Sequence, residues 1–167
     1  MPTQTTRTPD MSVRVSSEVP NEVRKLSNFL CFAIYSANLA FGRAYKPILD
    51  KLGLTYTQYV AMVALTEQDD QTVGALGEKL FLESNTLTPI LKKLESIGYI
   101  RRQRDPADER QVRVSLTPVG RALLDTEPAG SLVDATGLGE DFATVQQSVT
   151  RLRDNLLRST QSHPGKK

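Results

Sequence analysis

Residues 72–117 constrain the fold of this chain more tightly than any other part of its sequence. A short helix is predicted over Val73–Leu80, with Thr72 as its N-cap, and a short break separates it from a second helix over Thr86–Ile97. The apolar residues of the second helix follow the helical period, at Leu87, Ile90, Leu91 and Leu94. Two short helices joined by a tight turn form a helix-turn-helix.

The start of the second helix has two candidates. Ser84 can serve as its N-cap, or Thr88 can do so with Pro89 at the favoured first helical position. Gly98 is expected to end the helix, because glycine readily adopts the backbone conformation that follows a helical C-terminus.

Two strand-like segments follow, Tyr99–Gln103 and Gln111–Leu116, on either side of the turn sequence RDPADER. Apolar and polar residues alternate along the second segment, as in a half-buried strand, and the Asp- and Pro-rich sequence fits a hairpin tip. Thr117-Pro118 then opens another helix. A helix-turn-helix followed directly by a hairpin is a winged helix, so we expect a mainly α fold with a small β-hairpin wing (α+β).

A long amphipathic helix precedes the winged helix. From Asn21 to Leu52 the apolar residues recur at spacings of three and four, and Gly53 supplies a stop. Pro47 leaves open a kink or an earlier end around Ala44–Tyr45.

Further helices complete the expected fold. One begins at Thr55, whose spacing to Gln58 fits a capping box, and ends in the polar sequence EQDDQ. Helix-breaking residues at 127–130 and 136–139 interrupt the chain after the hairpin. The last helix is defined by the apolar positions Phe142, Val145, Val149, Leu152, Leu156 and Leu157.

The distribution of charge along the chain is more informative about possible binding partners than the net charge of +2. Residues 81–121 hold eight basic and five acidic residues, so this stretch alone is +3. The start of the second short helix offers small polar side chains followed by lysines: Ser84, Asn85, Thr86, Thr88, Lys92 and Lys93. The hairpin adds arginines: Arg101, Arg102, Arg104, Arg110 and Arg113. The alternative is a solvated charged face, but together with the architecture these residues favour binding to double-stranded DNA.

Several classes of protein are unlikely from composition. One cysteine cannot form an internal disulfide, and a lone Cys with a lone His, His163, cannot build a zinc finger, so we expect no metal and no cofactor. No stretch approaches the roughly 20 apolar residues that cross a bilayer, and the first residues lack the apolar core of a signal peptide. The expected setting is therefore the cytoplasm, without a membrane partner.

The wing sequence DPADERQVRVSLTPVG resembles that of MarR-family repressors, in which D-x-R-x-x-x-V-x-L-T is the most specific motif. The matching residues are Asp108, Arg110, Val114, Leu116 and Thr117. The resemblance implies a homodimer on a pseudo-palindromic operator, with Arg110 in the minor groove and Asp108 bracing it.

The first predicted helix carries a narrower resemblance. Its sequence LCFAIYSANLAFGRAYKPILDKLGLTYTQY is similar to that of the organic-hydroperoxide sensors (OhrR-like) within this family. In those sensors a cysteine near the start of the helix is oxidised and tyrosines hold the reduced thiolate; Cys31, Tyr35, Tyr45 and Tyr56 fall on the matching positions. The resemblance implies an organic hydroperoxide as oxidant. Without a second cysteine, the chain is similar to the one-cysteine type, in which an external low-molecular-weight thiol forms a mixed disulfide.

The residues themselves are compatible with this chemistry. Cys31, Tyr35, Asn38, Gly42 and Tyr45 recur at steps of four and three, which places them on one stripe of a helix. Hydroxyl donors favour the thiolate, which is the form that attacks a peroxide. The sulfenic acid product captures an external thiol or proceeds to sulfinic and sulfonic acid. The hypothesis is a transcriptional repressor that leaves its operator when Cys31 is oxidised.

Other interpretations of the sequence stay open. Cys31 could be an ordinary small residue of an apolar interface. The chain could also be a MarR-type repressor that is released by a small aromatic ligand, bound between the helix-turn-helix lobe and the dimer helices. A thiol peroxidase is disfavoured because no resolving cysteine, arginine or histidine is placed near Cys31 for turnover. We therefore expect a regulator and not an enzyme.

These expectations divide the chain into five regions. Residues 1–20 form a flexible arm, 21–54 an N-terminal sensor and dimerisation helix, and 55–117 the winged helix-turn-helix. Residues 118–160 form the C-terminal dimerisation helices, and 161–167 a disordered tail.

Overall fold

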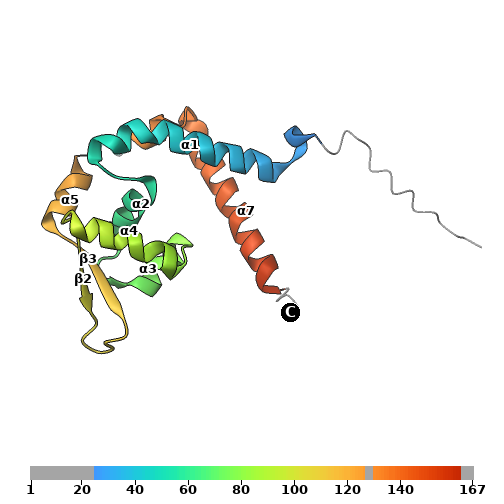
Figure 1. The fold of residues 1–167 in the computed structure, drawn as a ribbon. Helices are drawn as coiled ribbons and strands as arrows, with labels where there is room; N and C mark the ends of the chain where they lie inside the picture. The colour runs from blue at the N-terminus through green and yellow to red at the C-terminus, as the bar shows by residue number, and fades with distance from the viewer. Residues whose placement is uncertain (1–24, 127–129, 163–167) are drawn as a thin grey trace, which may run out of the picture. The chain divides into compact units, whose positions relative to one another are not determined.

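The computed structural model describes residues 25–126 and 130–162 (Figure 1). The chain divides into two compact units, residues 1–37 and 38–167, and each is described by itself. The arm predicted over residues 1–20 lies outside the described residues. The predicted tail begins inside a helix at residues 161–162, and its remainder, with His163, also lies outside them.

In the described part of the first unit, a 3-10 turn, Leu26–Asn28, precedes helix α1, Leu30–Leu52. The prediction that this helix already starts at Asn21 is wrong for the described residues, because Phe29 between the two elements is extended (φ −94°, ψ 110°). Ser27 and Asn28 precede the break, and both residue types favour turns and helix ends over helix interiors. Cys31 is therefore the second residue of its helix.

Helix α1 continues past Pro47 to Leu52, so it does not end early near Ala44–Tyr45. Gly53 follows with φ +67°, as expected for the residue after a helix. Thr55 then caps α2, Tyr56–Glu67, in the predicted capping box: its hydroxyl accepts from the Gln58 amide N–H (3.3 Å), and its own N–H donates to the Gln58 side chain (2.8 Å).

Helices α3, Val73–Leu80, and α4, Ser84–Ser96, form the predicted helix-turn-helix. The Thr72 hydroxyl caps α3 by accepting from the Ala75 N–H (3.1 Å). The turn between the helices passes through Phe81, which has left-handed backbone angles (φ +56°).

The N-cap of α4 is Glu83, and neither Ser84 nor Thr88 serves as predicted. The Glu83 carbonyl accepts the first helical hydrogen bonds, from the N–H groups of Thr86 (3.0 Å) and Leu87 (2.9 Å). Thr88 instead lies inside the helix, where its hydroxyl donates to the Ser84 carbonyl (2.6 Å). A cap made by backbone alone leaves no side-chain signal in the sequence.

A three-stranded antiparallel sheet completes the winged helix, in the order β1 (Gln71–Thr72), β3 (Val112–Leu116), β2 (Ile100–Arg104). In the hairpin Ile100 pairs with Leu116 and Arg104 with Val112, which confirms the predicted wing to within one residue. The two-residue strand β1 was missed, because its length gives no period to detect. Figure 1 shows the hairpin extending away from the helices.

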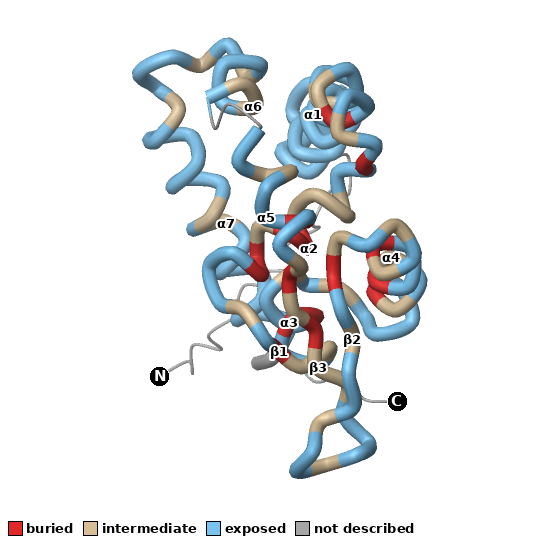
Figure 2. Tube along the Cα trace, turned by 90° about the vertical axis from the view of Figure 1, so that its left-hand side faces the viewer, coloured by how far each residue is buried: buried red, intermediate tan, exposed pale blue. Residues whose placement is uncertain are grey.

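The core lies between α2, α3, α4 and the sheet, where the buried segments gather (Figure 2). Its largest fully buried side chains are Met62, Leu65, Leu76, Leu87, Leu91, Leu94 and Val114. Three of these leucines belong to α4, so the apolar face of this helix is fully used inside the second unit.

The elements after the wing are α5 (Pro118–Asp125), α6 (Ser131–Asp134), the 3-10 turn Gly139–Asp141, and α7 (Phe142–Ser162). Helix α7 exposes a run of large apolar side chains: Val145, Val149, Leu156 and Leu157. Helix α1 does the same with Phe32, Ile34, Leu39 and Phe41. Apolar rows of this kind on helices are typical of surfaces that become covered by a partner.

The start of α5 is docked closely on the end of α4 and the first wing strand. The Tyr99 carbonyl accepts from the N–H of Thr117 (3.0 Å) and from its hydroxyl (3.2 Å), and the same hydroxyl caps α5 at the Gly120 N–H (3.0 Å). A side chain at Gly120 would collide with the Tyr99 backbone. Only glycine permits this approach.

We expect Gly120→Ala to lower the free energy of unfolding by about 1–3 kcal/mol, because the added methyl group forces α5 away from Tyr99. Gly74→Ala is the matched control, since its methyl group would meet only the Thr72 hydroxyl, at 3.9 Å. At the second position of α3, Gly74→Ala should be neutral or stabilise by up to roughly 1 kcal/mol. Urea unfolding followed by circular dichroism measures both; equal stability of the two variants would contradict the close approach.

Candidate nucleic-acid interface and cysteine site

The first turn of α4 presents small polar side chains to solvent. Ser84, Asn85 and Thr86 are all exposed, and the Thr86 hydroxyl donates to the Asn85 side-chain oxygen (3.3 Å). Thr88 is half-buried and its hydroxyl is directed back to the helix backbone. The structure thus leaves three of the four predicted polar residues free to meet a ligand, and leaves Thr88 with a local role.

The cations of this region fall into two groups. Lys92, Lys93 and Arg104 are exposed and form no ion pair within residues 25–126 and 130–162. Arg102 differs, because it is tied to Glu95 near the end of α4: Nε and Nη2 lie 2.9 and 2.8 Å from one carboxylate oxygen, and the Arg102 N–H donates to the other (3.2 Å). Its side chain is only 22% exposed. Arg102 was predicted as a DNA contact; in the structure its main contact joins the wing to α4.

At the wing tip, Asp108 holds Arg110 as the resemblance implied. One carboxylate oxygen of Asp108 accepts from the Arg110 Nε (3.0 Å) and backbone N–H (3.2 Å), while Gln111 donates to the other (3.1 Å). These donors, Arg110 first, lower the pKa of Asp108. The Arg110 side chain is nevertheless 91% exposed, so its guanidinium stands at the tip with its outer edge free.

Arg113, grouped with the basic hairpin from sequence, is bound on two sides. Its Nε donates to the Asp70 carboxylate (3.0 Å) and its Nη1 to the Asp105 carboxylate (3.1 Å). These two hydrogen bonds raise the pKa of Arg113. Sequence reasoning missed both acids, because Asp70 is 43 residues distant and Asp105 read as part of a hairpin tip.

A hollow of about 460 Å³ lies where the helix-turn-helix and the wing converge. It is lined by Thr72, Val73, Gly74, Ser84, Thr88, Arg102, Arg110, Gln111 and Val112. The two parts of the winged helix therefore share one hollow, which is lined by polar and apolar side chains.

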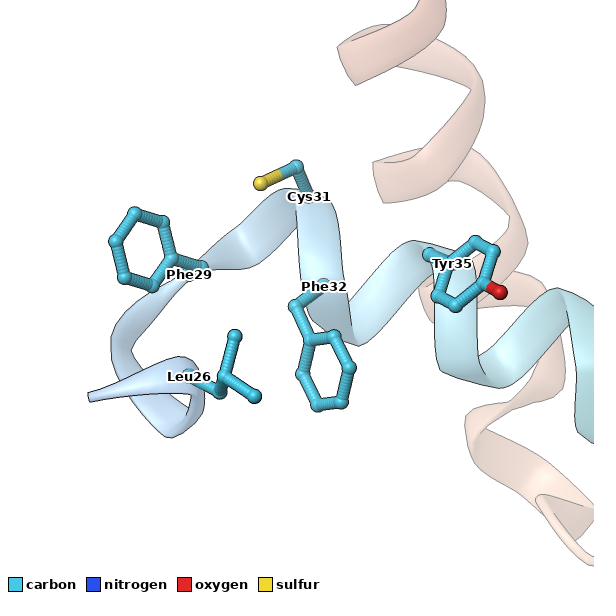
Figure 3. Close-up of a pocket in the computed structure, with 5 residues that line it drawn as sticks. All are labelled: Leu26, Phe29, Cys31, Phe32 and Tyr35. Carbon is cyan, nitrogen blue, oxygen red and sulfur yellow. The ribbon is translucent and has the colours of Figure 1, made fainter. Parts of the chain in front are cut away.

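In the first unit, Cys31 is exposed and lines an apolar hollow of about 290 Å³ with Leu26, Phe29, Phe32 and Tyr35 (Figure 3). Figure 3 shows the sulfur directed to the side of Phe29, whereas the Tyr35 hydroxyl points away from it. The Tyr35 ring instead neighbours Phe32, with ring centroids 6.5 Å apart. Within this unit Tyr35 thus does not donate to the thiol.

In the second unit, Tyr45 and Tyr56 lie together. Their ring centroids are 5.8 Å apart, and the centroid of the Phe41 ring lies 5.4 Å from that of Tyr45. Burial, with a smaller effect of the neighbouring Tyr56, raises the pKa of Tyr45, so its phenol keeps its proton and remains a hydrogen-bond donor. The pair lines a hollow of about 450 Å³ together with Asn38, Leu39, Phe41, Gly42 and Thr57.

The described ranges hold no group of His, Cys, Asp and Glu side chains suited to a metal ion. Likewise, none of the helices in these ranges combines the length and the apolar character needed to span a bilayer.

Comparison with known proteins shows which family has this architecture. The family described as "Transcriptional regulator SarA/Rot" matches residues 43–126. The organic hydroperoxide resistance transcriptional regulator of Bacillus subtilis is 41% identical over 135 residues, which are 79% of this chain and 92% of that protein. The HTH-type transcriptional regulator TtmR of Methylorubrum extorquens is 48% identical over 103 residues, which are 62% of this chain and 53% of the length of TtmR. These relatives are regulators and not enzymes.

Solved structures of transcriptional regulators have the same fold as this chain. Reduced AbfR bound to DNA is similar with a TM-score of 0.69 and 32% identity, over 82% of this chain and 98% of that one. AbfR has also been solved overoxidised on DNA and in a disulfide-formed state. MarR of Escherichia coli shares the fold (TM-score 0.61) at 22% identity, over 74% of this chain and 96% of that one. The family model matches half of the sequence, and the regulator of Bacillus subtilis is 41% identical over most of it. Both findings agree with the winged helix of the structure. The chain belongs to the SarA/Rot group of MarR-type winged helix-turn-helix transcriptional regulators.

Proposed function

We propose that this chain is a redox-responsive repressor that binds operator DNA as a homodimer and leaves it when Cys31 is oxidised by an organic hydroperoxide. The observation that carries the proposal is the exposed Cys31 thiol, set in an apolar hollow at the start of α1, in a chain whose winged helix presents exposed cations, Arg110 at the wing tip among them. The name of the relative from Bacillus subtilis and the reduced, overoxidised and disulfide-formed states of AbfR support it.

In the DNA-bound dimer, α4 enters the major groove with Ser84, Asn85 and Thr86 toward the base edges. Lys92, Lys93 and Arg104 contact phosphates, and Arg110 at the wing tip reaches the minor groove, whose negative potential attracts a guanidinium. Arg102 contributes less, because Glu95 already neutralises it. Thr88 supports the helix.

The dimer follows from the exposed apolar faces of α1 and α7. Residues 21–54 and 118–160 supply these faces and cover one another between two copies. Two-fold symmetry then sets the two α4 helices about 34–36 Å apart, one turn of DNA, and requires a pseudo-palindromic operator.

The chemistry begins with the Cys31 thiolate. Its position as the second residue of α1 places it at the positive end of the helix dipole, where negative charge is favoured. The sulfur attacks the outer peroxide oxygen, the O–O bond breaks, and the alkoxide leaves with a proton as an alcohol, which yields the sulfenic acid of Cys31. The alkyl group of the peroxide fits the apolar hollow of Leu26, Phe29 and Phe32.

The sulfenic acid then has two fates. An external low-molecular-weight thiol attacks its sulfur, a disulfide bond forms, and hydroxide leaves as water. Alternatively, further equivalents of peroxide add oxygen to give sulfinic and sulfonic acid. Overoxidised AbfR was solved on DNA, which favours the mixed disulfide as the product that releases this chain.

Tyrosine hydroxyls connect the thiol to the rest of the dimer. Because Tyr35 points away from the sulfur, we assign the donor role to the Tyr45 and Tyr56 pair in the assembled dimer, with Tyr35 supporting the interface through Phe32. A bulky adduct on Cys31 removes these hydrogen bonds and alters the wing spacing. A change from mostly bound to mostly free requires about 5.5 kcal/mol of differential stability. A few buried hydrogen bonds, at about 1–3 kcal/mol each, together with repacking, supply it.

A second candidate rests on the hollow beside Tyr45 and Tyr56. At about 450 Å³ and partly aromatic, it has the size of a site for a small aromatic ligand. Release by such a ligand would not depend on Cys31.

The first test is Cys31→Ser. Wild-type protein bound to its operator should be released by tert-butyl hydroperoxide with cysteine present, whereas the variant should stay bound, because serine lacks the nucleophilic sulfur. A gel-shift assay follows the DNA and mass spectrometry follows the mass of the tryptic peptide with Cys31. Equal release of both proteins would refute the mechanism and favour the ligand-gated alternative.

The second test concerns the DNA face. Lys92→Ala should weaken binding to every duplex and reduce the slope of log K against log [salt] by about 0.9, the loss of one phosphate contact. The exposed Lys51 on α1 serves as control, and Lys51→Ala should leave the slope unchanged. Fluorescence anisotropy between about 50 and 200 mM salt measures both. A flat response of the wild-type protein to salt would refute the DNA-binding role.

A further inference from the structure

The wing is a long hairpin that projects from the helices (Figure 1), so its direction depends on side-chain contacts at its base and along its strands. Glu95 holds Arg102 on one strand, and Arg113 lies on the other, opposite Gln103. Of the basic residues on the wing, Arg113 contacts both the wing tip and the helix-turn-helix lobe.

The contact of Arg113 with the lobe is made at the turn between α2 and β1. The Asp70 side chain and the Asp70 carbonyl both accept from the guanidinium. Asp70 has left-handed backbone angles (φ +52°) and directly precedes β1 and the N-cap of α3, so its position is coupled to the helix-turn-helix. The neighbouring Asp69 accepts from the Leu116 N–H (3.0 Å), which fixes the other end of the same strand.

The contact with the tip runs through Asp105. This carboxyl is only 14% exposed, and its second oxygen accepts from the Ala107 N–H (2.8 Å) inside the tip. The Asp105 N–H in turn donates to the Gln111 carbonyl (3.0 Å), and the Gln111 N–H to the Asp108 carbonyl (2.8 Å). A chain of contacts thus leads from Asp70 through Arg113 and Asp105 to the residue that holds Arg110.

We propose that Arg113 is a positioning residue for DNA binding: by holding Asp70 and Asp105 at once, it sets the direction of the wing and carries Arg110 to its place in the minor groove. The inference rests on the proposed DNA-binding function. Its guanidinium is not a phosphate contact, because two carboxylates already occupy its donors. Arginine is required, since the ammonium group of lysine cannot span both acids in this planar arrangement.

The test asks whether operator affinity rises or falls when one of these two acids is neutralised. Asp105→Asn and Asp70→Asn remove negative charge near the DNA, which by electrostatics alone strengthens binding. If these acids hold Arg113, operator affinity should instead fall about tenfold, the effect of losing one charged hydrogen bond. Affinity for a random duplex should stay equal or rise. Glu109→Gln is the matched control, as Glu109 is an exposed acid of the same tip, and its operator affinity should be unchanged or higher.

A double-mutant cycle separates positioning from phosphate contact. Asp105→Asn should lower operator affinity in the wild-type protein but leave it unchanged or raise it in Arg113→Gln, because the contact that Asp105 makes is already lost there. A hydroxyl-radical footprint of Arg113→Gln should lose protection at the outer minor-groove positions and keep it over the major groove. Thermal unfolding of each variant monitors folding, and Asp70→Asn, at an exposed carboxyl, serves if Asp105→Asn is unstable.

Two outcomes overturn the inference: operator affinity of Asp105→Asn and Asp70→Asn that matches or exceeds that of Glu109→Gln, or an equal loss of affinity from Asp105→Asn with and without Arg113. Failure of the wild-type protein to bind any duplex would instead refute the proposed function.

Discussion

The packing of α4 against α2 and α3 is the interaction on which the polar face of the winged helix depends. Leu87, Leu91 and Leu94 are fully buried, so one side of α4 is fixed in the core and the opposite side must face solvent. Each such leucine contributes about 2–5 kcal/mol against truncation to alanine, a large part of the roughly 5–15 kcal/mol that stabilises a domain. The orientation of Ser84, Asn85 and Thr86 is therefore set from the inside of the protein.

Most of the fold could be predicted from sequence because its signals are local. The capping box at Thr55, the hydroxyl cap at Thr72 and the Thr117-Pro118 start of α5 all lie where the residue pattern places them. The errors occur where backbone atoms alone, without a side-chain cap, determine the residue at which a helix begins. The Glu83 cap uses only a carbonyl, and the extended Phe29 interrupts an apolar period that reads as continuous.

The candidate site was predicted less completely, since its missing part is made of long-range pairs. The basic character of the wing was evident, yet counting arginines could not tell which are already neutralised. Arg102 and Arg113 meet Glu95, Asp70 and Asp105, and Asp70 comes from a turn far away in the sequence. The wing is thus held together by some of its cations, and others remain available to DNA. The charge of +3 over residues 81–121 is correct as a sum but is unevenly shared.

The late start of α1 has a consequence for how long a redox signal would persist. With Cys31 as second residue of α1, the positive end of the helix dipole favours an anion beside it, and sulfinic and sulfonic acids are such anions. Small thiols do not return either acid to the thiol, whereas they do reduce a mixed disulfide. In a chain with one cysteine, the proposed switch would therefore reset only if oxidation stops at the mixed disulfide, at a rate that depends on the supply of small thiols around the protein.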